Sequence, residues 1–160
     1  MIFATVGTQL PFPRLIDALE ALAPELGEAV IAQTGLAAGS WPHLDVRPRL
    51  APKDFAAIFE AARVVVSHAG VGSILSARRY RKPLIVMPRR LALGEHRNDH
   101  QMATARHVEG LHGVHVAWEA EELRELLRRP GLEAAAEKTD LSPSHSALIQ
   151  RVQAFIREAG

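Results

Sequence analysis

The segment at residues 67–73 carries the residue pattern best suited to bind a phosphate. It follows a β-branched apolar run and contains two glycines, Gly70 and Gly72, which allow a tight turn and a close approach of a ligand. A helix that begins after such a turn presents unpaired amides and a partial positive charge, and both favour an anion. The segment therefore predicts a diphosphate site, where His68 and Ser73 could also donate hydrogen bonds. A turn needed only for helix–strand packing remains the alternative.

Two known phosphate motifs do not account for this segment. It lacks the Gly-Lys-Ser/Thr ending of a P-loop, and its glycine spacing does not match the dinucleotide fingerprint. A similar but weaker pattern, a glycine turn after an apolar run, occurs at Gly7, Thr8 and Gln9. Thr8 could bind an anion there or simply cap the next helix.

The densest polar run spans residues 95–101. His96 and His100 are four residues apart, a spacing that suggests zinc on a helix, but no third ligand stands at a suitable spacing, and we predict no bound metal. A solvated helix start is a second interpretation. The third is a platform for a polyhydroxylated ligand, because amide and carboxylate groups can engage sugar hydroxyls. The side chains that would form this platform are Asn98, Asp99 and Gln101.

Seven basic residues crowd the window from 78 to 97, where Glu95 is the single acid. Such a window could attract a nucleotide sugar, an anionic membrane surface or an acidic partner, or it could be a solvated helix face. Arg89 is the most interesting of these residues. It follows a predicted strand and Pro88, so we expect it at the edge where ligands bind.

The elements that must position these groups alternate between strands and helices. Short apolar runs predict strands at residues 2–6, 29–33, about 46, 64–66, 83–87 and 114–117. Apolar spacing predicts helices near 13–22, 54–62 (with Asp54 as cap), 73–80, 98–109, 121–128 and 143–158, and a short exposed helix at 132–138. The alternation predicts an α/β fold, Rossmann-like and doubly wound, with a mostly parallel sheet. All three polar segments follow strands, so they should share the carboxyl edge.

Composition narrows the possible functions. The 160 residues predict a single domain over 1–160, with a C-terminal helix at about 143–158. The absence of cysteine excludes disulfide scaffolds, iron–sulfur sites and thiolate chemistry. A net charge of +1 argues against a nucleic-acid-coating role, and no apolar run is long enough to cross a bilayer. The first residues do not read as a signal peptide, so the expected location is the cytoplasm.

Four segments occur in an order that resembles a known family: residues 2–9, 66–74, 82–89 and 96–101. Together they are similar to the C-terminal, donor-binding domain of family 28 glycosyltransferases. The similarity is strongest to the split type, in which that domain is a separate small protein. Examples are the PssE/EpsE-type subunits of bacterial exopolysaccharide synthesis and the soluble subunit of the eukaryotic dolichol-linked N-acetylglucosamine transferase.

The resemblance implies one half of a GT-B fold that binds a UDP-sugar and needs no further cofactor. The diphosphate would be held by the turn of His68, Ala69, Gly70, Val71, Gly72 and Ser73. Further donor contacts are expected from Thr8, Gln9, Arg89, Asn98, Asp99 and Gln101. Uracil would rest near residues 50–53. The acceptor site and the catalytic base would belong to a membrane-associated partner, which would recruit this chain to the inner face of the membrane.

One position departs from the family pattern. Relatives usually carry a glutamate that grips the ribose hydroxyls, and this chain has Ser76 at the matching position. A serine can make one such hydrogen bond but cannot accept two from a diol. The sequence therefore leaves a second hypothesis open: a non-catalytic nucleotide-binding or regulatory module that docks a membrane-bound partner.

Overall fold

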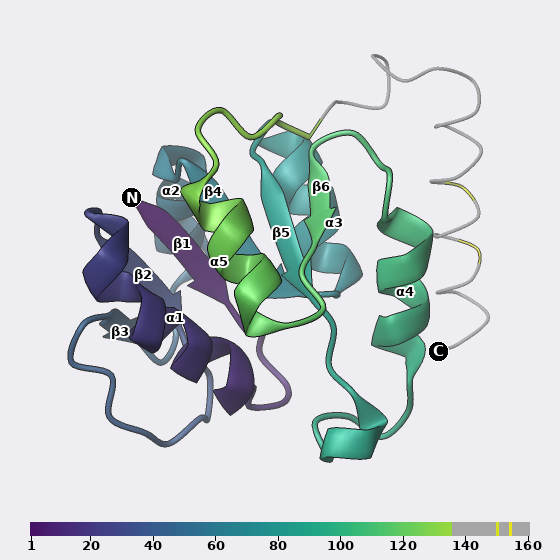
Figure 1. Ribbon diagram of the computed structural model, residues 1–160, viewed down its shortest axis with the longest axis horizontal. Helices are drawn as coiled ribbons and strands as arrows, with labels where there is room; N and C mark the ends of the chain where they lie inside the picture. Colours follow the sequence, from purple (N-terminus) through teal and green to yellow (C-terminus); the bar gives the residue numbers. More distant parts are fainter. Residues whose placement is uncertain (136–149, 151–153, 155–160) are drawn as a thin grey trace.

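The computed structural model describes residues 1–135 together with Gln150 and Ala154. In this part of the chain, six strands form one open sheet in which every neighbouring pair is parallel (Figure 1). The strands are β1 (Ile2–Thr5), β2 (Val30–Gln33), β3 (Asp45–Arg47), β4 (Val64–His68), β5 (Leu84–Met87) and β6 (Val114–Val116). Their order across the sheet is β3-β2-β1-β4-β5-β6. The predicted C-terminal helix at 143–158 lies outside the described residues, apart from two isolated positions.

Helices cover both faces of this sheet. The described helices are α1 (Pro13–Leu26), α2 (Pro52–Ala61), α3 (Val71–Arg79), α4 (His100–Val108) and α5 (Ala120–Arg128), with a short 3₁₀ turn η1 (Leu91–Leu93). One hydrophobic cluster packs α1 and α5 against one face, and a second packs α2, α3 and α4 against the other (Figure 1). The prediction of a Rossmann-like, doubly wound α/β fold is confirmed, and the sheet is wholly parallel.

The central strand β1 shows how the sequence builds these layers. Its side chains alternate between faces, so Ile2 and Ala4 join the cluster under α1 while Phe3 points to the opposite cluster. Phe3 meets Phe59 of α2 edge-on, with ring centroids 6.0 Å apart. A parallel strand buried on both faces needs apolar residues at every position, which is why the run of strand residues is almost continuously hydrophobic.

The strand order creates a crevice between β1 and β4. The chain leaves β1 toward α1 on one face and leaves β4 toward α3 on the other, so the loops that follow these adjacent strands diverge. Ligands of open α/β sheets bind at such a switch point, beyond the carboxyl ends of the strands. The loops that begin at Val6 and Ala69 therefore frame the place where a ligand would enter.

Three local predictions are corrected by the structure. Strand β4 continues to His68, so this histidine ends the strand instead of opening the turn. Helix α2 begins at Pro52 with Ala51 as cap, and Asp54 lies inside its first turn. Residues 132–135 are not helical: the backbone amide of Ala135 donates to the Lys82 carbonyl (3.2 Å), and this segment crosses close over Gly113.

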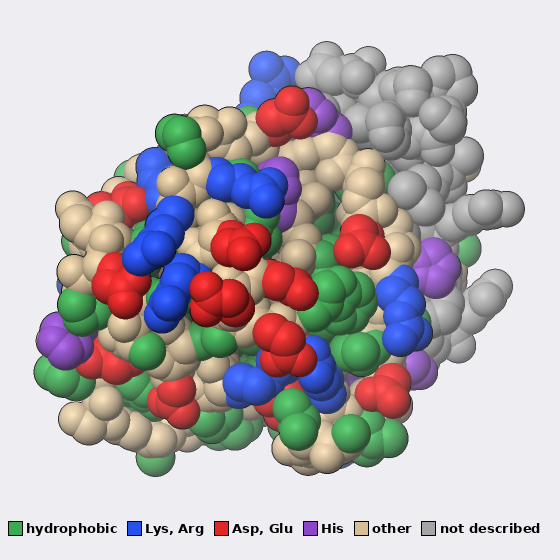
Figure 2. Space-filling view, in the orientation of Figure 1, with side chains coloured by type: hydrophobic (Ala, Val, Ile, Leu, Met, Phe, Trp, Pro, Cys, Tyr) green, Lys and Arg blue, Asp and Glu red, His purple; other side chains and the backbone are tan. Residues whose placement is uncertain are grey.

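Charges of both signs are mixed on the face formed by α1 and α5 (Figure 2). Glu25 of α1 lies 2.5 Å from the Arg128 guanidinium and 3.8 Å from that of Arg124, both on α5. Acidic side chains gather near the middle of this face with basic side chains around them, and some of these charges are paired (Figure 2). Among the helices of the described residues, none combines the length and hydrophobicity that a membrane span requires.

Candidate functional site

The three polar segments predicted from the sequence meet at one edge of the sheet. The Arg89 guanidinium, beyond β5, donates to the carbonyls of Val6 (2.9 Å) and Leu10 in the loop after β1. The Arg89 backbone amide donates to Oε1 of Gln101 in α4 (3.1 Å). Arg89 also lies near enough to His68, at the end of β4, to influence its ionisation. The predicted convergence of these loops is confirmed.

His68 lies in a slot formed by two glycines. A Cβ atom added to Gly70 would come within 2.2 Å of His68 Nε2, and one added to Gly7 within 2.8 Å of His68 Cε1. Gly7 also has a φ of +77°, which side chains rarely adopt. Burial, together with the Arg89 guanidinium, lowers the pKa of His68 to about 4. The imidazole is therefore neutral at neutral pH, and its buried Nδ1 has no hydrogen-bond partner in the described structure.

The first turn of α3 opens toward the crevice. Gly70 is the N-cap in an extended conformation, and no side chain caps the helix. The first amides of a helix have no acceptor within the helix, so those of Val71, Gly72 and Ser73 are available to an external anion. A Cβ on Gly72 would have no atom within 4 Å. Gly70 thus makes room for His68, whereas Gly72 leaves open space beside the helix amides.

These groups surround a cavity of about 350 Å³, which we call the carboxyl-edge cavity. Its lining consists of Thr5, Gly7, Thr8, Gln33, Leu50, Pro52, Phe55, His68, Gly72, Ser73 and Ser76. A neighbouring cavity of about 280 Å³ shares four of these residues, including Gln33 and Leu50. With His68 neutral, no described side chain lining the carboxyl-edge cavity carries a charge.

Several predicted site residues lie in this cavity. Thr8, His68, Gly72 and Ser73 line it directly, with Ala69, Gly70 and Val71 in the same turn. The segment at 50–53, expected to carry uracil, contributes Leu50 and Pro52 to the opposite wall. Gln9 is exposed in the first loop and does not line the cavity.

The polar run after β5 is engaged in its own loop. Asp99 Oδ1 accepts a hydrogen bond from the Leu91 amide (3.0 Å), and Asn98 Oδ1 accepts one from the His100 amide (3.1 Å). Gln101 holds the Arg89 backbone, as described above. These three side chains shape the loop without lining the carboxyl-edge cavity, so their contact with sugar hydroxyls stays a prediction.

Arg89 is buried under the loop that follows β1 and supports it through hydrogen bonds. Its side chain is 3% exposed, and its guanidinium stacks over the Phe12 ring at 5.0 Å. Burial lowers the pKa of Arg89 to about 10, so the group keeps its charge at neutral pH. The observed contacts make Arg89 a brace for the loop that carries Thr8, and a direct contact with a donor stays a prediction.

Sequence reasoning missed Gln33, at the carboxyl end of β2. Gln33 is 6% exposed and accepts a hydrogen bond from the Thr5 hydroxyl (2.8 Å), while Thr5 Oγ1 accepts from the Gly7 amide (3.2 Å). These two hydrogen bonds hold the start of the loop that follows β1. The signal was present, because Gln33 is a polar residue at the end of an apolar run, where parallel strands expose ligand-binding groups.

The spacing of His96 and His100 does not produce a helical pair. His96 precedes α4 and His100 is its first residue. Within residues 1–135, 150 and 154, no group of three His, Asp or Glu side chains is arranged to hold a metal ion.

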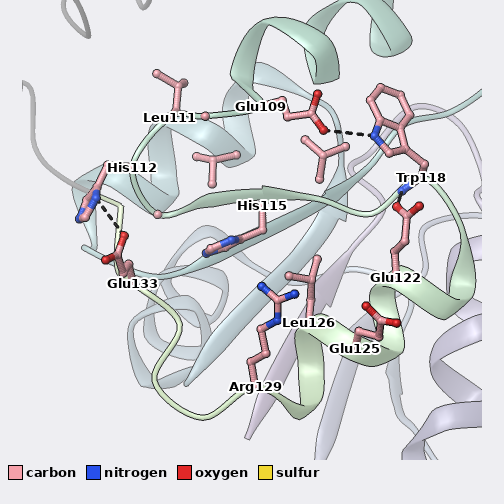
Figure 3. A pocket seen from close by; sticks show the side chains of 14 residues that line it. Glu109, Leu111, His112, His115, Trp118, Glu122, Glu125, Leu126, Arg129 and Glu133 are labelled. Atoms are coloured by element: carbon pink, nitrogen blue, oxygen red, sulfur yellow. Dashed lines mark hydrogen bonds and ion pairs between the residues drawn. The ribbon is translucent and has the colours of Figure 1, made fainter.

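A larger cavity, of about 660 Å³, runs along the open edge of β6 between α4 and α5 (Figure 3). We call it the β6-edge cavity. Two pairs of its polar side chains are in contact: His112 lies 3.1 Å from Glu133, and the Trp118 indole donates to Glu109 at 3.4 Å. The buried Nε2 of His115 has no hydrogen-bond partner among the described residues. Burial and the nearby Arg129 lower the pKa of His115 on its floor. This cavity lies at an edge strand, away from the β1–β4 crevice.

Comparison with known proteins gives a family match over most of the chain. The model of the glycosyltransferase family 28 C-terminal domain matches residues 1–157. No curated protein matches the chain.

Solved structures share the fold at low sequence identity. The solution structure of ALG13 is 21% identical with a TM-score of 0.58, and the match covers 94% of each chain. CalG4, the calicheamicin glycosyltransferase, is 20% identical with a TM-score of 0.57. SsfS6 of Streptomyces sp. SF2575, solved with thymidine diphosphate, is 21% identical with a TM-score of 0.53. Both matches cover 98% of this chain, which spans 38% of CalG4 and 37% of SsfS6. The likeness shows the fold, one half of a GT-B glycosyltransferase.

Proposed function

The chain belongs to the family of glycosyltransferase family 28 C-terminal domains, and we propose that it is the donor-binding subunit of a two-component inverting glycosyltransferase. In this proposal it binds a UDP-sugar and acts with a membrane-associated subunit that binds the acceptor, as PssE/EpsE-type subunits do in polysaccharide or lipid-linked glycan synthesis. The observation that carries the proposal is the open first turn of α3 beside an uncharged cavity at the β1–β4 crevice.

The cavity offers a suitable surface for each part of a nucleoside diphosphate. The amides of Gly72 and Ser73 favour the diphosphate through the helix dipole, without a dedicated cation. The apolar wall of Leu50, Pro52 and Phe55 suits a flat base. Support for this class of ligand comes from the SsfS6 structure, which has the same fold and was solved with thymidine diphosphate.

The chemistry of the cavity favours a mechanism in which the catalytic base comes from a partner protein. A general base works best with a pKa near the operating pH, and His68, with a pKa of about 4, is far from it. No described residue that lines the cavity is a carboxylate. Sugar transfer also needs the donor and acceptor held together with water excluded, and a single Rossmann-like domain supplies one wall of such a cleft. The match to ALG13 covers 94% of both chains, so this fold also occurs in a protein of similar size without a second domain in the matched structure.

Calorimetric titration of the purified chain with UDP tests donor binding. We expect weak, saturable binding of UDP and much weaker binding of uridine, because the helix amides act on the diphosphate. No heat at millimolar UDP would contradict donor binding and favour the alternative, a regulatory module that only docks its partner.

A transfer assay tests the two-component mechanism. The chain alone, given a UDP-sugar and protein-free lipid acceptor, should release no UDP, and activity should appear when the acceptor-binding subunit is added. Sugar transfer by the single chain would show that the base and the acceptor site belong to this protein.

A further inference from the structure

Ser76 lies on the same cavity wall as the open first turn of α3. It lines the carboxyl-edge cavity from α3, four residues after Gly72 and three after Ser73, so the three residues share one face of the helix. One helical turn rises about 5.4 Å. Since the ribose is joined directly to the diphosphate, a nucleotide held by the first amides of α3 brings its sugar within about one turn of them, toward Ser76.

A site that discriminates ribose from deoxyribose needs a group that forms a hydrogen bond with the 2′-hydroxyl. Nucleotide sites on this kind of fold commonly use a carboxylate, which can accept hydrogen bonds from both ribose hydroxyls. A site built around such a bond rejects the analogue that lacks the hydroxyl, because a buried polar group would otherwise be left unpaired. Without that group, removal of the 2′-hydroxyl costs the complex little.

The carboxyl-edge cavity holds no such group among its described lining residues. The lining contains no Asp or Glu, and Ser76 is half-buried with one small hydroxyl. Of the other deep polar pair, the Thr5 hydroxyl and Gln33 Oε1 are joined by their own hydrogen bond, and the remaining Gln33 Nε2 group can only donate, so it cannot accept from the ribose diol. A serine hydroxyl that loses a ligand partner can turn to water, so it imposes no penalty on a deoxyribose.

We propose that this site, accepting the function proposed above, does not select ribose, and that it binds thymidine and 2′-deoxyuridine diphosphates as well as UDP. Ser76 is the residue that sets this permissiveness. The donor class of the enzyme therefore extends to sugars carried on deoxynucleoside diphosphates. The apolar wall of Leu50, Pro52 and Phe55 offers contact to the additional methyl group of thymine.

Parallel calorimetric titrations with UDP, 2′-deoxy-UDP and TDP test this inference on the full chain. The comparison of UDP with 2′-deoxy-UDP isolates the 2′-hydroxyl, and that of 2′-deoxy-UDP with TDP isolates the methyl group. We expect the three dissociation constants to agree within about threefold. Binding of UDP that is tighter than that of 2′-deoxy-UDP by about tenfold or more would overturn the inference while leaving donor binding intact. Failure of all three to bind would overturn the proposed function as well.

The variant Ser76→Glu tests the position. Glutamate suits a helix and the site is partly open, so the fold should be retained, which a thermal melt checks. We expect Ser76→Glu to favour UDP over 2′-deoxy-UDP by about tenfold, through new hydrogen bonds to the diol. The matched control Ser76→Gln, with the same length and no charge, should show a smaller preference. If Ser76→Glu folds and still binds both nucleotides equally, Ser76 does not face the ribose and the inference fails.

Discussion

The carboxyl-edge cavity and the β6-edge cavity use their polar groups in opposite ways. The β6-edge cavity is nearly twice as large, about 660 against 350 Å³, and its lining includes several charged side chains, some in contact with a neighbour, as Glu133 is with His112. The carboxyl-edge cavity has no charged side chain in its described lining, but the helix amides at Gly72 and Ser73 are open. We therefore choose the candidate site by its place at the topological switch point, where helix amides are open, and not by cavity volume or charge.

The largest expected effect tests which cavity binds the nucleotide. The variant Gly72→Leu places a side chain in open space beside the α3 amides, where no neighbour lies within 4 Å. Because the new side chain occupies the position of the diphosphate, we expect UDP affinity to fall by about 100-fold, equivalent to about 2.7 kcal/mol. Isothermal titration measures the affinity, and a thermal melt shows that the fold is kept.

The matched control for this variant lies in the other cavity. Glu125→Leu adds the same side chain at an exposed position of α5 that lines the β6-edge cavity. We expect UDP affinity to stay within about twofold of the unmodified chain, since surface changes away from a site have small effects. A loss of affinity in Glu125→Leu, with Gly72→Leu unaffected, would reverse the assignment of the two cavities.

A pH series separates the two cavities through their histidines. The pKa of His68 is lowered to about 4 in the folded chain, against an ordinary value of 6.5. The unfolded chain therefore binds a proton more readily, so the stabilisation is present above pH 6.5 and is lost as the pH falls toward 4. From pH 7.5 to pH 5, this histidine should lower the free energy of unfolding by about 2 kcal/mol.

Urea denaturation at both pH values measures this loss, and histidine variants assign it. His68→Gln should reduce the pH-dependent loss by more than His115→Gln does, although the pKa of His115 is also lowered, by burial. The comparison uses the change between the two pH values within each variant, so a general loss of stability does not affect it. Equal effects of the two substitutions would mean that the slot around His68 does not exclude a proton.

The fold, and the edge of the sheet where the candidate site lies, could be predicted from the sequence alone. Strand Leu84–Met87 and the first three residues of Val64–His68 are apolar and buried on both faces of the sheet, so the sequence alone predicts them as strands. Since parallel strands end at one edge, the polar segments that follow them had to converge.

The contacts within the site could not be predicted from the sequence. The sequence neighbours of Gly70 predict that it makes room for a ligand, and in the structure its missing side chain leaves room for the His68 ring. Asn98 and Asp99 have the right chemistry for sugar hydroxyls, and the sequence pattern did not indicate that one oxygen of each accepts a hydrogen bond from a nearby amide. These outcomes depend on side-chain directions, which a pattern of residue types does not contain.

A smaller effect sharpens the difference between the two glycines of the turn. In Gly70→Ala the new methyl group would lie 2.2 Å from His68 Nε2, so the ring or the backbone must move. We expect the free energy of unfolding to fall by about 1.5 kcal/mol, typical of an overpacked site. Gly72→Ala has no such neighbour and gains helix propensity, so its stability should be unchanged or slightly higher. Urea denaturation curves of both variants measure this difference in stability. Equal stabilities would argue against the close packing of His68 on Gly70.

The smallest expected effect concerns the charged groups of the β6-edge cavity. His112 Nδ1 lies 3.1 Å from Glu133 Oε2, and the two side chains are 46% and 69% exposed. Because water screens such a pair and both side chains lose freedom in forming it, His112→Ala should change the free energy of unfolding by less than about 0.5 kcal/mol. The variant should also leave UDP affinity unchanged, in contrast to Gly72→Leu. A loss above about 1 kcal/mol in the free energy of unfolding, measured by urea denaturation, would contradict this expectation. It would mean that the contact between His112 and Glu133 stabilises the edge strand β6.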